Sequence, residues 1–295
     1  MNYLEVAFTV PAPAAEAVAW ALTEHGLPGV VVGERRPDDP ITEHAVLKAY
    51  LPQLDAAPDL GALEAAARQA IASVQLEGDV TLATRVVPEE DWATSWQQYW
   101  HVQRIGERLV VRPSWEEYTA APGDVVITLD PKMAFGTGTH PTTRLCMRAL
   151  ERLAAKGPLG HVYDVGAGSG ILAIAALLLG APDAIAVDTD PVAVAASEEN
   201  GVINGVADRL VNRVGSAGDL PGQAEVVFAN ILAEVIVELA DSLYAVTAPG
   251  GTLIASGIIE RKAEMVAEAL KAAGYQVIER EPEGEWVGLT AVRPA

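Results

Sequence analysis

Cysteine is almost absent from this chain of 295 residues, because Cys146 is the only one. A single thiol excludes an internal disulfide framework and is typical of a reducing compartment. Long hydrophobic runs are also missing: the longest, residues 171–179, falls far short of the ~20 residues that span a bilayer. No basic segment precedes an apolar run near residue 1, so we expect no secretory signal and a cytoplasmic protein.

Basic residues are scarce as well. The chain has 20 Lys and Arg against 40 Asp and Glu, which gives a formal net charge of −20. A field of this sign repels nucleic-acid backbones and anionic membranes, and no run of Lys and Arg indicates a local exception. We therefore expect no direct binding to nucleic acid or membrane. The acidic excess either serves solubility alone or speeds the encounter with a basic partner, and the sequence leaves both interpretations open.

The first 87 residues have the pattern of a small α+β domain. Alternating and helical spacings predict strands at 3–10, 29–33, 44–51 and 80–87, with helices at 14–25 and 59–74. The resulting order βαββαβ predicts a ferredoxin-like sandwich. Residues 88–104 are expected to connect it to the rest of the chain, through a helix with Trp92, Trp96 and Trp100 on one face. These rings form a ligand platform or, as we favour, pack the connector against a neighbouring domain.

Residues 105–295 have the pattern of a larger α/β domain. After a strand pair at 108–112 and 125–129, short apolar segments alternate with helices, which predicts a doubly wound, mostly parallel sheet covered on both faces. The last two strands follow each other without a helix, so we expect an antiparallel hairpin at the sheet edge. The predicted strands are 161–165, 184–188, 209–214, 225–230, 251–256, 275–281 and 286–292, and the helices 141–156, 169–180, 191–204, 231–245 and 260–273.

A glycine-rich turn follows the first of these strands. Asp164 precedes Gly166, Gly168 and Gly170, a D-x-G-x-G-x-G pattern typical of S-adenosylmethionine-dependent methyltransferases. Glycines let the backbone turn tightly and approach a ligand, whose carboxylate the free N–H groups at a helix start can hold. The dinucleotide fingerprint would require a third glycine where this chain has Ile171. The turn therefore favours a methyl-transfer cofactor over a nicotinamide dinucleotide.

Polar residues end two further strands, and ligands of open parallel sheets bind at such carboxyl ends. Asp188 can accept hydrogen bonds from both ribose hydroxyls of a nucleoside cofactor. Asp190 with Pro191 instead has the pattern of a helix cap. Asn230 holds the position at which many amine methyltransferases carry Asn-Pro-Pro-aromatic, but Ile231-Leu232 replace the prolines here. Asn230 thus either orients an amine or cofactor or caps the next helix.

A fourth group of candidates, residues 130–143, precedes the sheet. Pro141 suits a helix start, which places Thr143 in the first helical turn, where its hydroxyl could face the cofactor cleft. His140 is a weak candidate for a general base; the catalytic residue is otherwise unknown. No second histidine or cysteine lies at ligand spacing, so we expect no metal site.

These motifs together resemble one family, the bacterial ribosomal protein L11 methyltransferases of the PrmA type. The resemblance is dense over residues 88–293, and in the N-terminal unit it extends to size and layout. It implies a class I, Rossmann-like methyltransferase fold, and family cofactor contacts at Thr143, Gly166, Asp188 and Asn230. The matching segments are 134–143, 164–170 with Asp188, 230–232, and the shorter runs Glu90-Asp91-Trp92, Pro113-Ser114-Trp115, Ser256-Gly257-Ile258 and Glu285-Trp286.

The resemblance also implies an activity. The larger domain would transfer methyl groups from S-adenosylmethionine to lysine side chains and the N-terminal amine of ribosomal protein L11. The N-terminal domain would dock that basic protein of the large subunit, and we expect the enzyme to act as a monomer. The alternatives are a methyltransferase for a nucleic acid or a small-molecule amine, a nicotinamide-dependent oxidoreductase, and a docking protein without catalytic activity.

Overall fold

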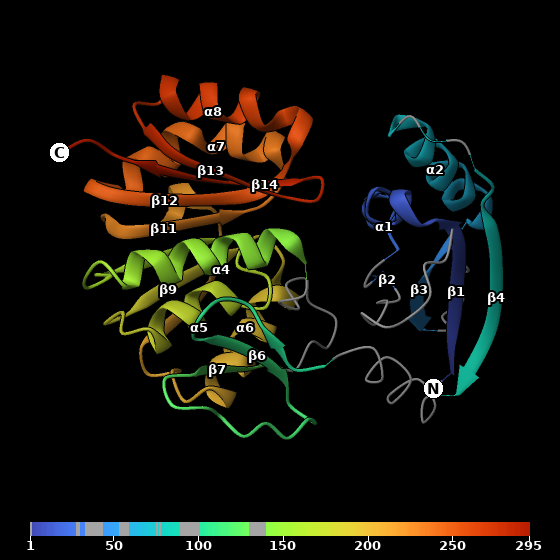
Figure 1. Ribbon diagram of the computed structural model, residues 1–295, viewed down its shortest axis with the longest axis horizontal. Helices are drawn as coiled ribbons and strands as arrows, with labels where there is room; N and C mark the ends of the chain where they lie inside the picture. Colours follow the sequence, from blue (N-terminus) through green and yellow to red (C-terminus); the bar gives the residue numbers. More distant parts are fainter. Residues whose placement is uncertain are drawn as a thin grey trace. The chain divides into compact units, whose positions relative to one another are not determined.

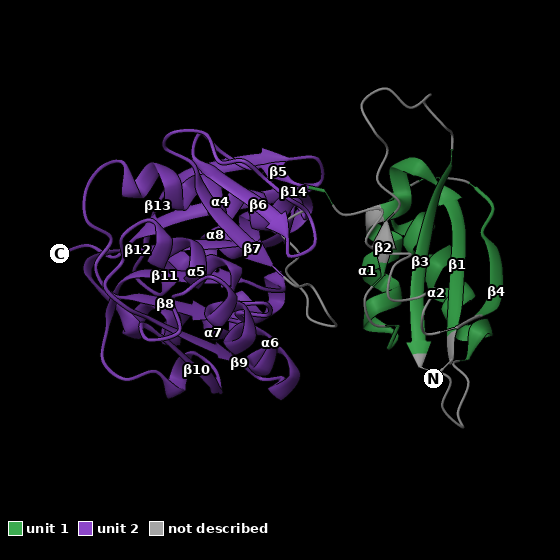
Figure 2. Ribbon diagram, turned by 90° about the horizontal axis from the view of Figure 1, so that it is seen from below, with its two compact units in different colours: residues 1–101 green, residues 102–295 purple. Residues whose placement is uncertain are grey.

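The computed structural model describes residues 2–27, 30–32, 44–52, 59–74, 76, 78–88, 101–129 and 140–295. It divides into two compact units, residues 1–101 (unit 1) and 102–295 (unit 2), each with its own sheet and helices (Figure 2). The expected connector helix with Trp92, Trp96 and Trp100 lies outside the described residues, as does the segment 130–139. No helix among the described residues is long and apolar enough to cross a membrane.

Unit 1 is an antiparallel sheet with two helices. Its strands β1 (Asn2–Pro11), β2 (Val31–Val32), β3 (His44–Pro52) and β4 (Thr81–Pro88) have the order β2-β3-β1-β4, and α1 (Ala15–Glu24) and α2 (Leu60–Ser73) connect them. Alternate residues Val6, Phe8 and Val10 of β1 are fully buried in the core of this unit. The order and the antiparallel pairing of β1 with β3 and β4 confirm the ferredoxin-like prediction.

Unit 2 begins with a small sheet of β5 (Gln103–Arg104), β6 (Leu109–Pro113) and β7 (Val125–Leu129). The predicted pair β6 and β7 is present, and it runs parallel. The outer edge of β7 meets the Asn204 side chain, whose amide oxygen accepts from Thr128 N at 2.8 Å while its Nδ2 donates to Thr128 O at 2.7 Å. Asn204 therefore bonds to β7 much as a neighbouring strand would.

The large sheet of unit 2 has the order β10-β9-β8-β11-β12-β14-β13. The chain leaves β8 toward β9 on one side and later enters β11 on the other, so the topological switch point lies between β8 and β11 (Figure 1). The strands are β8 (Val162–Val165), β9 (Ala184–Asp188), β10 (Leu210–Val214), β11 (Ala224–Asn230), β12 (Thr247–Ile259), β13 (Gln276–Glu283) and β14 (Trp286–Val292). The helices are α4 (Pro141–Ala154), α5 (Ile171–Leu178), α6 (Pro191–Ile203), α7 (Ala233–Val246) and α8 (Ala263–Ala272).

Pairing within this sheet confirms the predicted doubly wound, mostly parallel arrangement, with one refinement at its end. The strands from β10 to β12 are parallel, whereas β14 pairs antiparallel with both β12 and β13. The predicted hairpin is at the sheet edge, but its second strand lies inside and its first strand is the edge. β14 is the more apolar of the two and alternates buried residues along its length, which suits the interior position.

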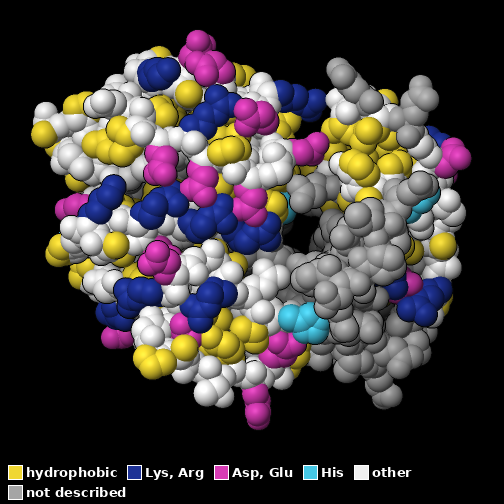
Figure 3. Space-filling view, viewed as in Figure 1, with side chains coloured by type: hydrophobic (Ala, Val, Ile, Leu, Met, Phe, Trp, Pro, Cys, Tyr) yellow, Lys and Arg dark blue, Asp and Glu magenta, His cyan; other side chains and the backbone are white. Residues whose placement is uncertain are grey.

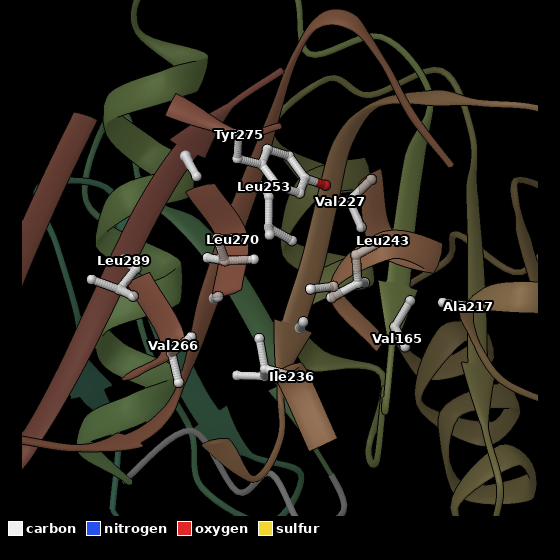
Figure 4. Packing of buried hydrophobic residues seen from close by; sticks show 14 of the residues in the cluster. Val165, Ala217, Val227, Ile236, Leu243, Leu253, Val266, Leu270, Tyr275 and Leu289 are labelled. Atoms are coloured by element: carbon white, nitrogen blue, oxygen red, sulfur yellow. The ribbon is translucent and has the colours of Figure 1, made fainter. Parts of the chain in front are cut away.

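Buried side chains on one face of this sheet form a large core with α7 and α8. Val165 of β8 packs there with Val227, Ile236 and Leu253, as Figure 4 shows. Because side chains alternate along a strand, Asp164 points to the opposite face, where α5 packs. The strand that ends in the glycine turn is thus fixed by apolar packing on one side and by a polar contact on the other.

Candidate active site

The glycine turn between β8 and α5 has the backbone that the sequence predicts. Gly166, Gly168 and Gly170 have φ values of 72°, 54° and 76°, in the left-handed region that favours glycine. A Cβ added at Gly166 would lie 2.2 Å from Cγ2 of Ile231, so this glycine also allows β8 and the end of β11 to pack closely. Backbone conformation and close approach both require glycine at this position.

Asp188 holds the turn in place from the neighbouring strand. Its Oδ2 accepts from Gly168 N at 2.9 Å, and its Oδ1 accepts from Asp190 N at 3.0 Å. The carbonyl of Val187 accepts from Gly166 N at 2.8 Å. Each oxygen of Asp188 accepts one hydrogen bond within the described structure, so both keep acceptor capacity for a ligand. Asp190 accepts from Val192 N at 2.8 Å as the N-cap of α6, which confirms its predicted role.

The N-cap residue of α5 is Gly170, which has no side chain to accept a hydrogen bond from the helix. Asp164 supplies that acceptor instead. Its Oδ2 accepts from Ala173 N at 3.2 Å, while its buried Oδ1 has no partner among the described residues. Burial raises the pKa of Asp164 to about 7; the bond from Ala173 opposes this shift and the charge of Asp188 adds to it. Asp164 is therefore a carboxyl that takes up a proton near neutral pH.

The predicted cofactor residues come together at one edge of the sheet. Val165 pairs with Val187 and with Ala229, so the next residues, Gly166, Asp188 and Asn230, follow three adjacent strand ends. From α4, the fully buried Thr143 joins them, since its Oγ1 accepts from Asn230 Nδ2 at 3.3 Å. Residues predicted from four separate segments thus surround the switch point.

Asn230 is not a helix cap. α7 begins at Ala233 with Leu232 at its N-cap, and the buried Oδ1 of Asn230 has no hydrogen-bond partner within the described part of the chain. Ile231, which replaces the expected proline, packs its side chain at Gly166, and a Cβ at Gly257 would lie 2.1 Å from its carbonyl oxygen. Of the two interpretations of Asn230, the structure therefore excludes the cap.

His140 is the N-cap of α4, as the Pro141 pattern suggests for this helix start. Its Nδ1 accepts from Thr142 N at 3.3 Å and lies 2.8 Å from Thr142 Oγ1. Its ring meets the Trp286 ring edge to face, with centroids 4.8 Å apart. Burial lowers the pKa of His140 to about 4; the charge of Arg144 adds to this shift and Glu283 opposes it. No cluster of potential metal ligands occurs among the described residues.

The atoms at this edge fit S-adenosylmethionine. The buried oxygens Asp164 Oδ1 and Asn230 Oδ1 lack hydrogen-bond donors in the described structure, and such oxygens are stabilised when a ligand supplies them. The cofactor carries an ammonium group and two ribose hydroxyls, which match these oxygens and the spare acceptor capacity of Asp188.

Comparison with known proteins gives the family. The family model for ribosomal protein L11 methyltransferase (PrmA) matches residues 2–294. The chain belongs to this family. The ribosomal protein L11 methyltransferase of Pelotomaculum thermopropionicum is 42% identical over 311 residues, and that of Chloroflexus aurantiacus is 41% identical over 335 residues. The match covers 99% of this chain in both cases, and 99% and 98% of the two relatives.

Solved structures include the ribosomal protein L11 methylase of Lactobacillus delbrueckii subsp. bulgaricus. That protein is 36% identical, with a TM-score of 0.62, and its match covers 66% of this chain and 100% of its own. Membership in the family confirms the predicted resemblance and makes the chain an S-adenosylmethionine-dependent methyltransferase. It excludes the nicotinamide oxidoreductase as the interpretation of the glycine turn.

Sequence reasoning missed two features of the site. Asp164 was considered only as part of the glycine motif, although a helix that begins after a glycine needs a cap acceptor from elsewhere, and that is a usable signal. The contact of Ile231 with Gly166 had no signal in the sequence. The two residues are 65 positions apart, and their contact can be inferred only once the strand order is known.

Proposed function

We propose that this chain methylates ribosomal protein L11, on lysine side chains and on the N-terminal amine, with S-adenosylmethionine as donor. The observation that carries the proposal is the convergence of Thr143, Gly166, Asp188 and Asn230 at one switch point. The full-length match to L11 methyltransferases supports the substrate.

We assign cofactor binding to these four residues. Gly166 and its neighbours leave space at the turn, Asp188 offers carboxylate oxygens, and Asn230 offers an amide oxygen that Thr143 orients through Asn230 Nδ2. When bound, the cofactor supplies a methyl group on a sulfonium centre, which an uncharged amine can accept. The protein's contribution is to align that amine and to exclude water.

The acceptor amine has to lose a proton first, because a free lysine with a pKa of ~10.4 is almost fully charged at neutral pH. His140 does not suit this role: its Nδ1 is used within the cap of α4, and burial lowers the pKa of its ring to about 4. Desolvation in a closed pocket favours the neutral amine, and its proton passes to bulk water before the pocket closes, so no protein base is needed. We therefore assign deprotonation to the environment of the amine and not to His140.

We assign the docking of L11 to an N-terminal domain, residues 1–87, followed by a connector at 88–104 and a methyltransferase domain at 105–295. The net charge of −20 suits a basic substrate, since opposite charges speed encounter. The same charge supports the absence of nucleic-acid binding. We infer a monomer that acts in the cytoplasm, where ribosomal proteins are made; light scattering of the purified protein tests the first of these.

The decisive experiment is transfer of a radiolabelled methyl group from S-adenosylmethionine to purified L11. Mass spectrometry of the product should find methyl groups on lysine side chains and the N-terminal amine. A mixture of the other large-subunit proteins and ribosomal RNA is the control. Label in RNA, or in other proteins with none in L11, would contradict the proposed substrate.

A further inference from the structure

His140 satisfies the whole N-terminus of α4. Pro141, the first helical residue, has no N–H group. The next three N–H groups all donate to His140: Thr142 N to its ring Nδ1, and Thr143 N and Arg144 N to its carbonyl oxygen, both at 3.1 Å. A helix start usually depends on several groups for this purpose. Here a single residue fixes the backbone of the turn that contains Thr143.

The ring of His140 is itself held from the sheet. Trp286, the first residue of β14, contacts it edge to face, with an angle of 69° between the ring planes. Among the described residues, the charges that act on the pKa of the ring are those of Arg144 on its own helix and Glu283 on β13, and these two form an ion pair with each other. Because Nδ1 accepts the bond from Thr142 N, the ring proton is on Nε2 and the ring is neutral.

Thr143 connects this cap to the cofactor residues. It is fully buried, and its Oγ1 accepts from Asn230 Nδ2, the same amide whose Oδ1 lacks a partner among the described residues. A shift of the first turn of α4 would therefore move Thr143 and rotate the amide of Asn230. A continuous series of contacts therefore leads from Trp286 through His140 and Thr143 to Asn230.

We propose that His140, held by Trp286, is a positioning residue that sets the orientation of Asn230 toward S-adenosylmethionine through Thr143. This inference rests on the cofactor site proposed above. It gives His140 a role in cofactor binding and not in proton transfer.

Two substitutions of His140 separate its cap acceptor from its ring contact with Trp286. His140→Phe keeps a ring against Trp286 but removes the acceptor of Thr142 N, and should make cofactor binding about fivefold weaker, which corresponds to about 1 kcal/mol of binding free energy. His140→Asn restores a cap acceptor and should recover most of that affinity. Calorimetry measures the dissociation constant of S-adenosylmethionine, and thermal unfolding confirms that each variant is folded. If His140→Phe fails to fold, Trp286→Leu takes its place as the test. This variant removes the ring contact and should weaken cofactor binding by less than fivefold.

The pH profile distinguishes positioning from acid–base catalysis. For His140→Asn we expect the pH dependence of kcat to keep its shape and KM for the cofactor to stay close to that of the unchanged protein. Loss of kcat with unchanged cofactor affinity in both His140 variants would overturn the proposal, as would unchanged affinity in His140→Phe. Thr143→Val and Asp188→Ala are the controls: if they too bind the cofactor normally, the proposed site itself is wrong.

Discussion

At the scale of single residues, Asp164 is a buried carboxyl that accepts one hydrogen bond, from Ala173 N, within the part of the chain that the structure describes. Its pKa rises from an ordinary 3.8 to about 7, mainly through burial. Between these values the unfolded chain loses the proton while the folded protein keeps it. The folded state then binds more protons, so the free energy of unfolding falls as pH rises, by up to about 1.4 kcal/mol per pH unit.

Asp164→Asn should remove this loss of stability between about pH 4 and pH 7. An amide oxygen still accepts from Ala173 N, so the cap of α5 is kept. Urea unfolding of the unchanged protein and of Asp164→Asn at pH 5 and pH 7 measures how the free energy of unfolding depends on pH. Asp190→Asn is the control, because it keeps an equally good cap on α6. Parallel pH dependence in the two proteins would contradict a raised pKa at Asp164.

Asp188 is the residue at which the cofactor site is tested most directly. Asp188→Ala should weaken binding of S-adenosylmethionine by roughly 1–3 kcal/mol, because ligand donors lose their acceptor. Part of this loss comes from Gly168 N, which loses its partner in the turn. Isothermal titration measures the affinity; a dissociation constant like that of the unchanged protein would remove Asp188 from the site.

At the scale of elements, an ion-pair ladder joins α4 to β13. Arg144, Arg148 and Arg152 lie one helical turn apart, and they pair with the alternate residues Glu279, Glu281 and Glu283 of the strand. Four helical residues rise ~6 Å and two strand residues ~6.7 Å, so the two rows stay in step. Figure 3 shows the dark blue band of basic side chains across unit 2, with acidic ones beside it.

Removing the middle of this ladder should destabilise the fold. Arg148 contacts both Glu281 and Glu283, and the side chains of Arg148 and Glu283 are only 25% and 23% exposed. Arg148→Met should cost about 1–3 kcal/mol, because Glu281 and Glu283 each lose one of their arginine partners in a half-buried setting. Arg280→Met is the matched control: its pair with Glu260 is 43% and 56% exposed, and an exposed pair contributes at most about 1 kcal/mol. Equal losses in chemical unfolding would show that burial of the ladder is irrelevant.

The elements that the sequence predicts best are those with a local signal. α6 was expected at 191–204 and spans Pro191–Ile203, because Asp190 and Pro191 define its start. The sequence also predicts that Thr143, Gly166, Asp188 and Asn230 lie near one another, because each lies at the end of a strand or in the first turn of a helix, and the structure brings them together. The ladder of α4 was not found, because Arg144 and Glu283 are far apart in sequence and meet only through the interior position of β14. The cap from Asp164 likewise depends on a tertiary contact.

At the scale of the molecule, each unit has a core of its own. Val6 and Phe8 belong to the core of unit 1, whereas Val165 and Ile236 belong to that of unit 2. A fragment of residues 102–295 should therefore fold and bind S-adenosylmethionine within about threefold of the whole chain, since all four residues proposed to bind the cofactor lie in it.

The same fragment should methylate L11 at least about tenfold more slowly, because the proposed docking through the N-terminal domain would raise the effective concentration of the amines at the site. Steady-state kinetics on L11, with S-adenosylmethionine saturating, make the comparison. Full activity of the fragment would place substrate recognition in unit 2.

The Asn204 side chain at Thr128 has a consequence for association in crowded solution. An open strand edge is a template on which another chain can add a strand and begin aggregation. By donating to Thr128 O and accepting from Thr128 N, this one amide occupies the groups that an added strand would need at that position. Asn204 thus blocks the β7 edge at Thr128, and a side-chain amide offers no further backbone groups to which another strand could add.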